Sequence, residues 1–160
     1  MKCPACENEL TEQKISGIHV NVCCDSCAGF WFHHSQLKKM ERVKLGAGSE
    51  LLHFKKAEGV KIYRGAENPC PQCKTTLLYR HFFSKKHDTE INQCSKCSGF
   101  WVDAGGLIDI MKTSKKEELL EIYFAAMINE KISGMNLGNQ DIAEAAAFIT
   151  VIFNFLNPQY

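Results

Sequence analysis

Closely spaced cysteine pairs, repeated twice along the chain, limit most strongly what this sequence can fold into. In each copy a Cys-Pro-x-Cys pair is followed by a Cys-x2-Cys pair that continues into Gly-Phe-Trp. The two pairs are 17 residues apart in the first copy and 20 in the second. A repeat that occurs only twice indicates duplicated modules rather than a solenoid. The three extra residues of the second copy are expected in a hairpin tip.

This spacing is typical of four-cysteine metal sites. Two thiolates on one tight turn can bind one ion. Two strands between the cysteine pairs would place a second such turn beside the first and complete a tetrahedron of sulfur. A unit of about 35 residues is also shorter than the roughly 40 at which chains usually fold without a metal or disulfide. Thiolates favour Zn(II), with iron as the alternative, so we predict two structural Zn(II) ions per chain. The predicted ligands are Cys3, Cys6, Cys24, Cys27, Cys70, Cys73, Cys94 and Cys97.

The N-terminal sequence contains no apolar stretch before Cys3, so we expect no secretory signal and a reducing, cytoplasmic location. The longest run without a charged residue, 145–160, has 16 residues. A helix needs about 20 residues to span a bilayer, so a membrane-spanning segment is not expected.

Charge divides the chain into segments although the formal net charge is only +1. Residues 38–64 contain eight Lys and Arg and only three Glu. From Asp103 onward the balance reverses, with four Lys and eight Asp and Glu. The predicted organisation is ribbon 1 (1–45), a basic linker (46–67), ribbon 2 (68–112) and C-terminal helices (113–160).

The C-terminal segment is expected to form a helical pair. Ser114 has the spacing of an N-cap, and a second helix is expected from Asn139 or Asp141 to Asn157, before Pro158. The second helix is apolar nearly all round and therefore needs a partner surface. Because two small ribbons offer little core, we predict that it pairs with another chain to form a dimer. Packing within the chain and lying on a membrane surface are the alternatives, and the absence of Lys and Arg after Lys131 disfavours the membrane.

The sequence Cys-Pro-x-Cys, then Cys-x-x-Cys-x-Gly-x-Trp followed by Asp and Leu, resembles the zinc-ribbon family named after transcription initiation factor IIB. The resemblance covers residues 3–40 and 70–110, and copy one carries His33 where copy two has Asp103. It implies a zinc-binding ribbon in each copy but no reaction. The expected fold is therefore small α+β: two tandem zinc ribbons, each of short antiparallel strands plus a short helix, followed by the helical pair.

Three residues near the paired cysteines have two interpretations each. Cys23, the ninth cysteine, aligns with Gln93 and is expected to be an inert thiol outside the metal sites, with a reactive redox or exchange thiol as the alternative. Trp31 and Trp101 are expected to pack over the metal sites, with stacking on unpaired bases as the alternative.

The sequence contains no recognisable catalytic triad or phosphate-binding loop, so we predict a protein that is not an enzyme. The leading hypothesis is a macromolecular interaction module, transcription-related or regulatory, with a protein partner and nucleic-acid contact as a second target. The alternatives are a thiol-redox or zinc-responsive sensor using Cys23 and a membrane-associated adaptor that uses the C-terminal helix. The basic residues that would contact nucleic acid or a partner are Lys55, Lys56, Lys61, Arg64, Lys85 and Lys86.

Overall fold

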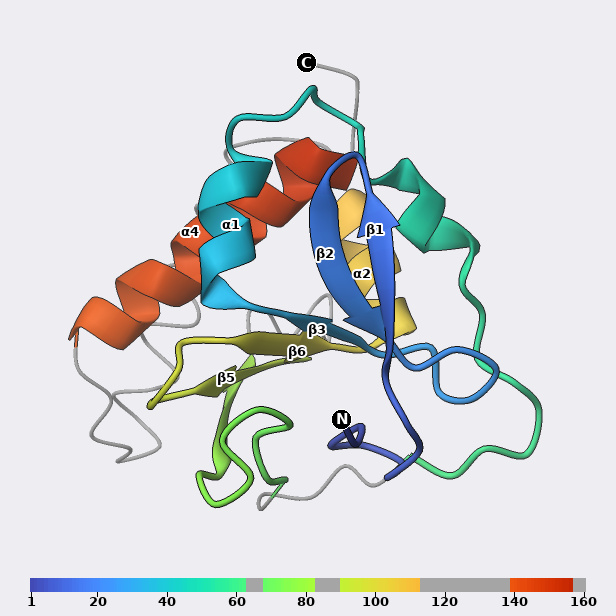
Figure 1. Cartoon of the computed structure of the whole chain (residues 1–160). Coiled ribbons are helices and arrows are strands. Elements are labelled where there is room, and N and C mark those ends of the chain that lie inside the picture. The colour runs from blue at the N-terminus through green and yellow to red at the C-terminus, as the bar shows by residue number, and fades with distance from the viewer. Residues whose placement is uncertain (63–67, 83–89, 113–138, 157–160) are drawn as a thin grey trace.

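The computed structural model describes residues 1–62, 68–82, 90–112 and 139–156 (Figure 1). Its strands form one six-stranded antiparallel sheet in the order β1-β2-β3-β6-β5-β4. The strands are β1 (Thr11–Ile15), β2 (Ile18–Val22), β3 (Phe30–Phe32), β4 (Leu78–Phe82), β5 (Glu90–Cys94) and β6 (Phe100–Val102). The helices are α1 (His34–Met40), the 3-10 helix η1 (Ser49–His53), α2 (Ala104–Lys112) and α4 (Asn139–Leu156).

Each cysteine copy folds as a hairpin, a third strand and a short helix, which confirms the predicted ribbon. In copy one, Ser16 and Gly17 join β1 to β2 with φ angles of 51° and 81°. Two successive positive φ values fit a type I′ turn, whose twist matches that of the flanking strands. The extra residues of copy two fall between β4 and β5, as predicted, and residues 83–89 of that connection lie outside the described residues.

The two ribbons are joined into a single sheet at their third strands. β3 pairs with β6 so that Trp31 lies opposite Trp101, Phe30 opposite Val102 and Phe32 opposite Phe100. No pattern in the sequence predicted this pairing. A third strand left at the edge of an isolated ribbon would expose unpaired backbone groups, and pairing the two copies satisfies them.

The alternation of side chains along β3 and β6 gives the sheet two different faces. Phe30, Phe32, Phe100 and Val102 point to the face that the helices cover, and Figure 1 shows α1, α2 and α4 together on this side. The Phe148 ring of α4 stacks on Phe100 with ring centroids 4.2 Å apart. The core of the molecule therefore lies between the joined sheet and the helices.

The second predicted C-terminal helix is confirmed as α4, and its apolar face packs within the same chain, which was the alternative to pairing with another chain. Its apolar side chains are buried within the same chain: Phe148, Ile149, Val151, Ile152, Phe153, Phe155 and Leu156. The backbone after α1 is hydrogen-bonded to the C-terminal end of α4. Gly46 N–H donates to the Asn154 carbonyl, and Gly48 N–H donates to the Phe155 carbonyl. The two ribbons together provide the broad apolar face that one ribbon lacks, so the helix needs no second chain. The helix predicted from Ser114 lies outside the described residues.

Of the helices that the structure describes, none combines the length and hydropathy required to cross a membrane.

Candidate metal centres

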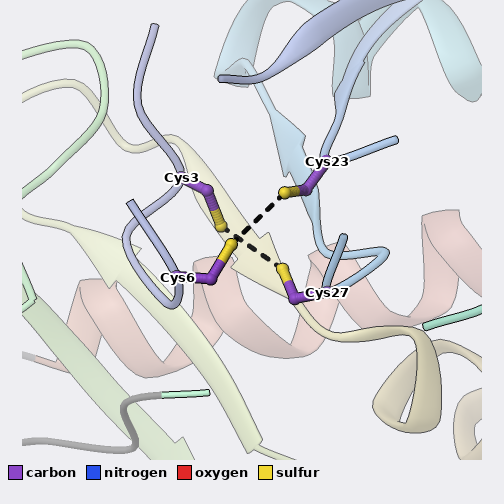
Figure 2. Close-up of side chains that lie close together, drawn as sticks. All are labelled: Cys3, Cys6, Cys23 and Cys27. Carbon is purple, nitrogen blue, oxygen red and sulfur yellow. Dashed lines mark hydrogen bonds between the residues drawn. The ribbon is translucent and has the colours of Figure 1, made fainter. Parts of the chain in front are cut away.

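In the first ribbon, four cysteine sulfurs converge from two turns. They belong to Cys3, Cys6, Cys23 and Cys27, and all four Sγ atoms lie within 4.8 Å of one another. Figure 2 shows two contacts that cross, with Cys3 and Cys27 Sγ 3.5 Å apart and Cys6 and Cys23 Sγ 3.4 Å apart.

The second ribbon repeats the arrangement with Cys70, Cys73, Cys94 and Cys97, again within 4.8 Å. The Sγ atoms of Cys70 and Cys97 are 3.7 Å apart, and those of Cys94 and Cys73 are 3.8 Å apart. All four predicted ligands of the second ribbon therefore lie together.

The two sulfur clusters fit zinc. A tetrahedral site with zinc–sulfur bonds of about 2.3 Å places its sulfurs about 3.8 Å apart. A disulfide would require about 2.05 Å, and all nine cysteines are free thiols. Soft thiolate donors select zinc or iron over hard cations. The chemistry and spacing of the donors thus assign two structural zinc ions to the two four-cysteine groups, one in each ribbon.

The backbone of both ribbons shapes the turns in the same way. In the N-terminal turns, Cys3 N–H donates to the Asn8 carbonyl and Cys70 N–H to the Thr76 carbonyl. Amide groups also point at the sulfurs, since Ala5 N–H donates to Cys3 Sγ at 3.4 Å and Cys73 N–H to Cys70 Sγ at 3.3 Å. Such donors stabilise the charged thiolates that a metal requires.

The second turn of ribbon 1 corrects the predicted ligand set, because the ligand is Cys23 and not Cys24. Asn21 pairs with Trp31 as Asn92 pairs with Trp101, so the residue two positions after each Asn occupies the ligand position. That residue is Cys23 in one ribbon and Cys94 in the other.

An extra residue in the turn explains the error. Cys23 and Cys27 are separated by three residues, and Asp25 accommodates the additional one with a φ of 53°. Both interpretations of Cys23, the favoured inert thiol outside the metal sites and the alternative reactive thiol, are therefore wrong. Cys24 is the ninth cysteine instead, and its Sγ accepts a hydrogen bond of 3.7 Å from Gln13 Nε2. The shared tripeptides Asn-Val-Cys and Asn-Gln-Cys carried the signal that would have given the correct register.

Protons and metal compete for these sulfurs. The hydrogen bond from Cys27 lowers the pKa of Cys3 to about 6, and the same contact raises the pKa of Cys27. Burial raises the pKa of Cys23 to about 12 and that of Cys70 to about 11. Four clustered thiols cannot all ionise without a cation between them, so metal binding must displace protons.

Both tryptophans are buried on the sheet face that carries the metal centres, which confirms core packing. Trp31 is 0% and Trp101 4% exposed, so neither ring is available to stack on a base. They share one apolar cluster with cysteines of both centres.

The remaining predicted contact residues are only partly described. Lys55, Lys56 and Lys61 are exposed, whereas Arg64, Lys85 and Lys86 lie outside the described residues. His33 occupies the position of Asp103, as expected, but the two differ in their contacts. Asp103 Oδ1 accepts the Gly106 N–H at the start of α2, while His33 makes no capping hydrogen bond to α1.

Comparison with known proteins agrees with this geometry. The family model described as transcription factor zinc-finger matches residues 2–42 and 69–113, which is more than half of the chain and includes both metal centres. Comparison with curated proteins and with solved structures gives no match. The chain therefore belongs to the transcription factor zinc-finger family, the zinc ribbons named after transcription initiation factor IIB, and carries two tandem copies of its domain.

Proposed function

We propose that the protein is a non-catalytic interaction module of the cytoplasm that uses its zinc ribbons as a scaffold to dock on a protein partner. The observation that carries this proposal is the donor set of each centre, in which four cysteine sulfurs complete the coordination. Catalytic zinc sites keep three protein ligands and an open position, whereas structural sites are closed. The eight free ligand thiols support the proposed cytoplasmic location, because a reducing compartment keeps thiols from forming disulfides.

The closed donor set can be tested on the cobalt-loaded protein, because Co(II) reports its coordination in visible absorption. Imidazole or azide is expected to leave the spectrum unchanged, since neither can displace a cysteine sulfur. The variant Cys27→Ser, which removes one sulfur, serves as the positive control and should respond. A saturable spectral change in the unaltered protein would show an open position and overturn the non-catalytic assignment.

Support for a protein partner comes from the outer strand of ribbon 2. Leu77 and Tyr79 are 51% and 37% exposed, and they lie two residues apart on β4 and the bridge that precedes it. Residues two apart in a strand point to the same side, so these apolar side chains are neighbours. The equivalent position of ribbon 1, Thr11, carries a polar side chain, and the near-neutral net charge gives no general attraction to nucleic acid.

Site-specific photo-crosslinking in cells tests this surface. A crosslinking amino acid at position 79 is expected to capture a discrete protein, which a crosslinker at position 11 does not capture. The purified partner should then bind the zinc-loaded chain, and Leu77→Ser with Tyr79→Ser should weaken that binding at least tenfold. Equal capture from positions 79 and 11 would contradict this surface.

A second candidate function, nucleic-acid binding, is supported by one observation in the linker. Lys55, Lys56 and Lys61 are exposed, and Ala57 N–H donates to the Ser26 carbonyl at 2.8 Å, which holds this basic segment against the turn of the first metal centre. Lysines placed beside a rigid turn could contact successive phosphates.

Binding of the zinc-loaded protein to random DNA and RNA across a salt series decides between the two candidates. The proposal of a protein partner predicts no binding even at low salt. Binding that weakens steeply with salt would instead favour nucleic acid, and each phosphate contact would contribute about 0.9 to the logarithmic slope on duplex DNA. Replacing Lys55, Lys56 and Lys61 by Gln should then reduce that slope.

A further inference from the structure

Each tryptophan of the paired strands lies over the metal-binding turn of the other ribbon. Gly99 follows the ligand Cys97 by two residues, and a Cβ at Gly99 would overlap the Trp31 ring. Reciprocally, Gly29 follows Cys27 by two residues, and a Cβ there would lie 2.6 Å from Cζ2 of Trp101. The glycine and tryptophan of the repeated motif therefore fit each other across the ribbons and not within one ribbon.

The two metal centres consequently share one packed core. A single apolar cluster contains both tryptophans and, as buried or partly buried members, all eight ligand cysteines. Trp31 and Trp101 are directly opposite each other in the β3–β6 pair at the middle of this cluster. Neither turn can become disordered without removing the surface on which the other ribbon's tryptophan rests.

A polar contact connects the ribbons at the same place. His33 Nδ1 lies 3.0 Å from Oε1 of Gln72, which is one of the two residues between the ligands Cys70 and Cys73. The other ring nitrogen, Nε2, lies 3.0 Å from Asn21 Oδ1 in ribbon 1. His33 thus joins β2 of the first ribbon to the N-terminal turn of the second centre.

This packing determines how metal binding at one centre affects the other. In small zinc domains the free energy of metal binding is also the free energy of ordering the site. Ordering one turn here also positions the tryptophan that covers the other turn, so the second ion binds to a site that is already partly ordered. We propose that the two centres load cooperatively, so that a metal ion in either ribbon raises the affinity of the other through Trp31 and Trp101.

The distribution of zinc among intact chains tests the proposal without any substitution. Native mass spectrometry of the full chain, equilibrated in a zinc buffer at half saturation, counts chains with zero, one and two ions. Independent sites, whether equal or unequal in affinity, leave about half of the chains or more with one ion. Tenfold coupling of equal sites lowers that fraction to about a quarter. We expect a fraction clearly below half, which no pair of independent sites gives. A fraction of half or more would overturn a coupling strong enough to outweigh the difference in affinity between the two centres.

Two glycine variants test the route through the tryptophan. Gly99→Ala places a methyl group against the Trp31 ring and should raise the one-zinc fraction to half or more. Gly105→Ala adds the same group to ribbon 2, where the nearest atom is Asp103 Oδ1 at 3.2 Å, and should leave the distribution unchanged. If Gly99→Ala fails to fold, Trp31→Phe replaces it and should have the same effect. Unchanged cooperativity in the folded variant would contradict the role of Trp31.

Discussion

Phe148 stacks on Phe100 with an interplanar angle of 9°, and this contact joins the C-terminal helix to the strand at the centre of the sheet. Phe148 also meets Phe32 edge to face, with ring centroids 5.7 Å apart. One aromatic side chain of α4 therefore packs on the third strand of both ribbons. The helix lies outside the two matched segments of the family model, yet it covers the line along which the two ribbons join.

Phe148→Ala is expected to reduce the free energy of unfolding by about 3–5 kcal/mol, because the side chain is 1% exposed and its loss leaves a cavity between two strands. The measurement is denaturant unfolding at a fixed free zinc concentration. Ala147→Gln, on the exposed side of the same helix, should change the stability by less than about 0.5 kcal/mol. Equal small effects of the two substitutions would show that α4 does not cover the sheet.

Cys23→Ser and Cys24→Ser form a matched pair of neighbouring substitutions with opposite expected results. Cys23→Ser should lower the zinc content from two ions per chain to about one, because it removes a sulfur from the first centre. Cys24→Ser should retain both ions, since this sulfur contacts Gln13 and lies outside the group. Metal analysis of the two purified variants checks the assignment, and loss of an ion from the Cys24 variant would restore the ligand set predicted from the sequence.

The sequence predicted the parts of the molecule that local spacing controls. Cysteine spacing gave both metal centres apart from one ligand, and the apolar pattern ending near Pro158 gave α4 to within one residue at its end. The ligand error arose because a turn can absorb one residue through a positive φ at Asp25, which spacing alone does not reveal. Strand register fixed the correct residue, and register is a property of the paired strands.

The sequence did not predict how the parts assemble. The pairing of β3 with β6 depends on backbone groups that any strand possesses, so no residue type marks it. Without that pairing, neither ribbon alone offers a surface large enough to cover α4, so the sequence favoured a partner chain for a helix that packs within its own chain. The contact of Gly29 and Gly99 with the opposite tryptophans depends on the same pairing. It could therefore not be predicted, although both glycines are part of the repeated motif.

Removal of zinc with a chelator is expected to unfold the sheet around both centres. Structural zinc contributes about 10–16 kcal/mol apparent per site in small peptides, which equals or exceeds the whole stability of a typical domain. Circular dichroism should show loss of strand signal, and tryptophan emission should shift to longer wavelength as Trp31 and Trp101 become exposed to water. Both signals should change together because the two rings occupy the core that contains the ligands.

The response to added metal distinguishes a structural thiolate site from a general effect of the chelator. Zn(II) or Co(II) should restore both signals, whereas excess Mg²⁺ should not, because a hard cation prefers oxygen ligands and binds four sulfurs poorly. A metal-free protein that keeps its strand signal and its buried tryptophan emission would contradict the prediction. In that case the packing of α4 on the joined sheet, rather than the metal, would supply most of the stability.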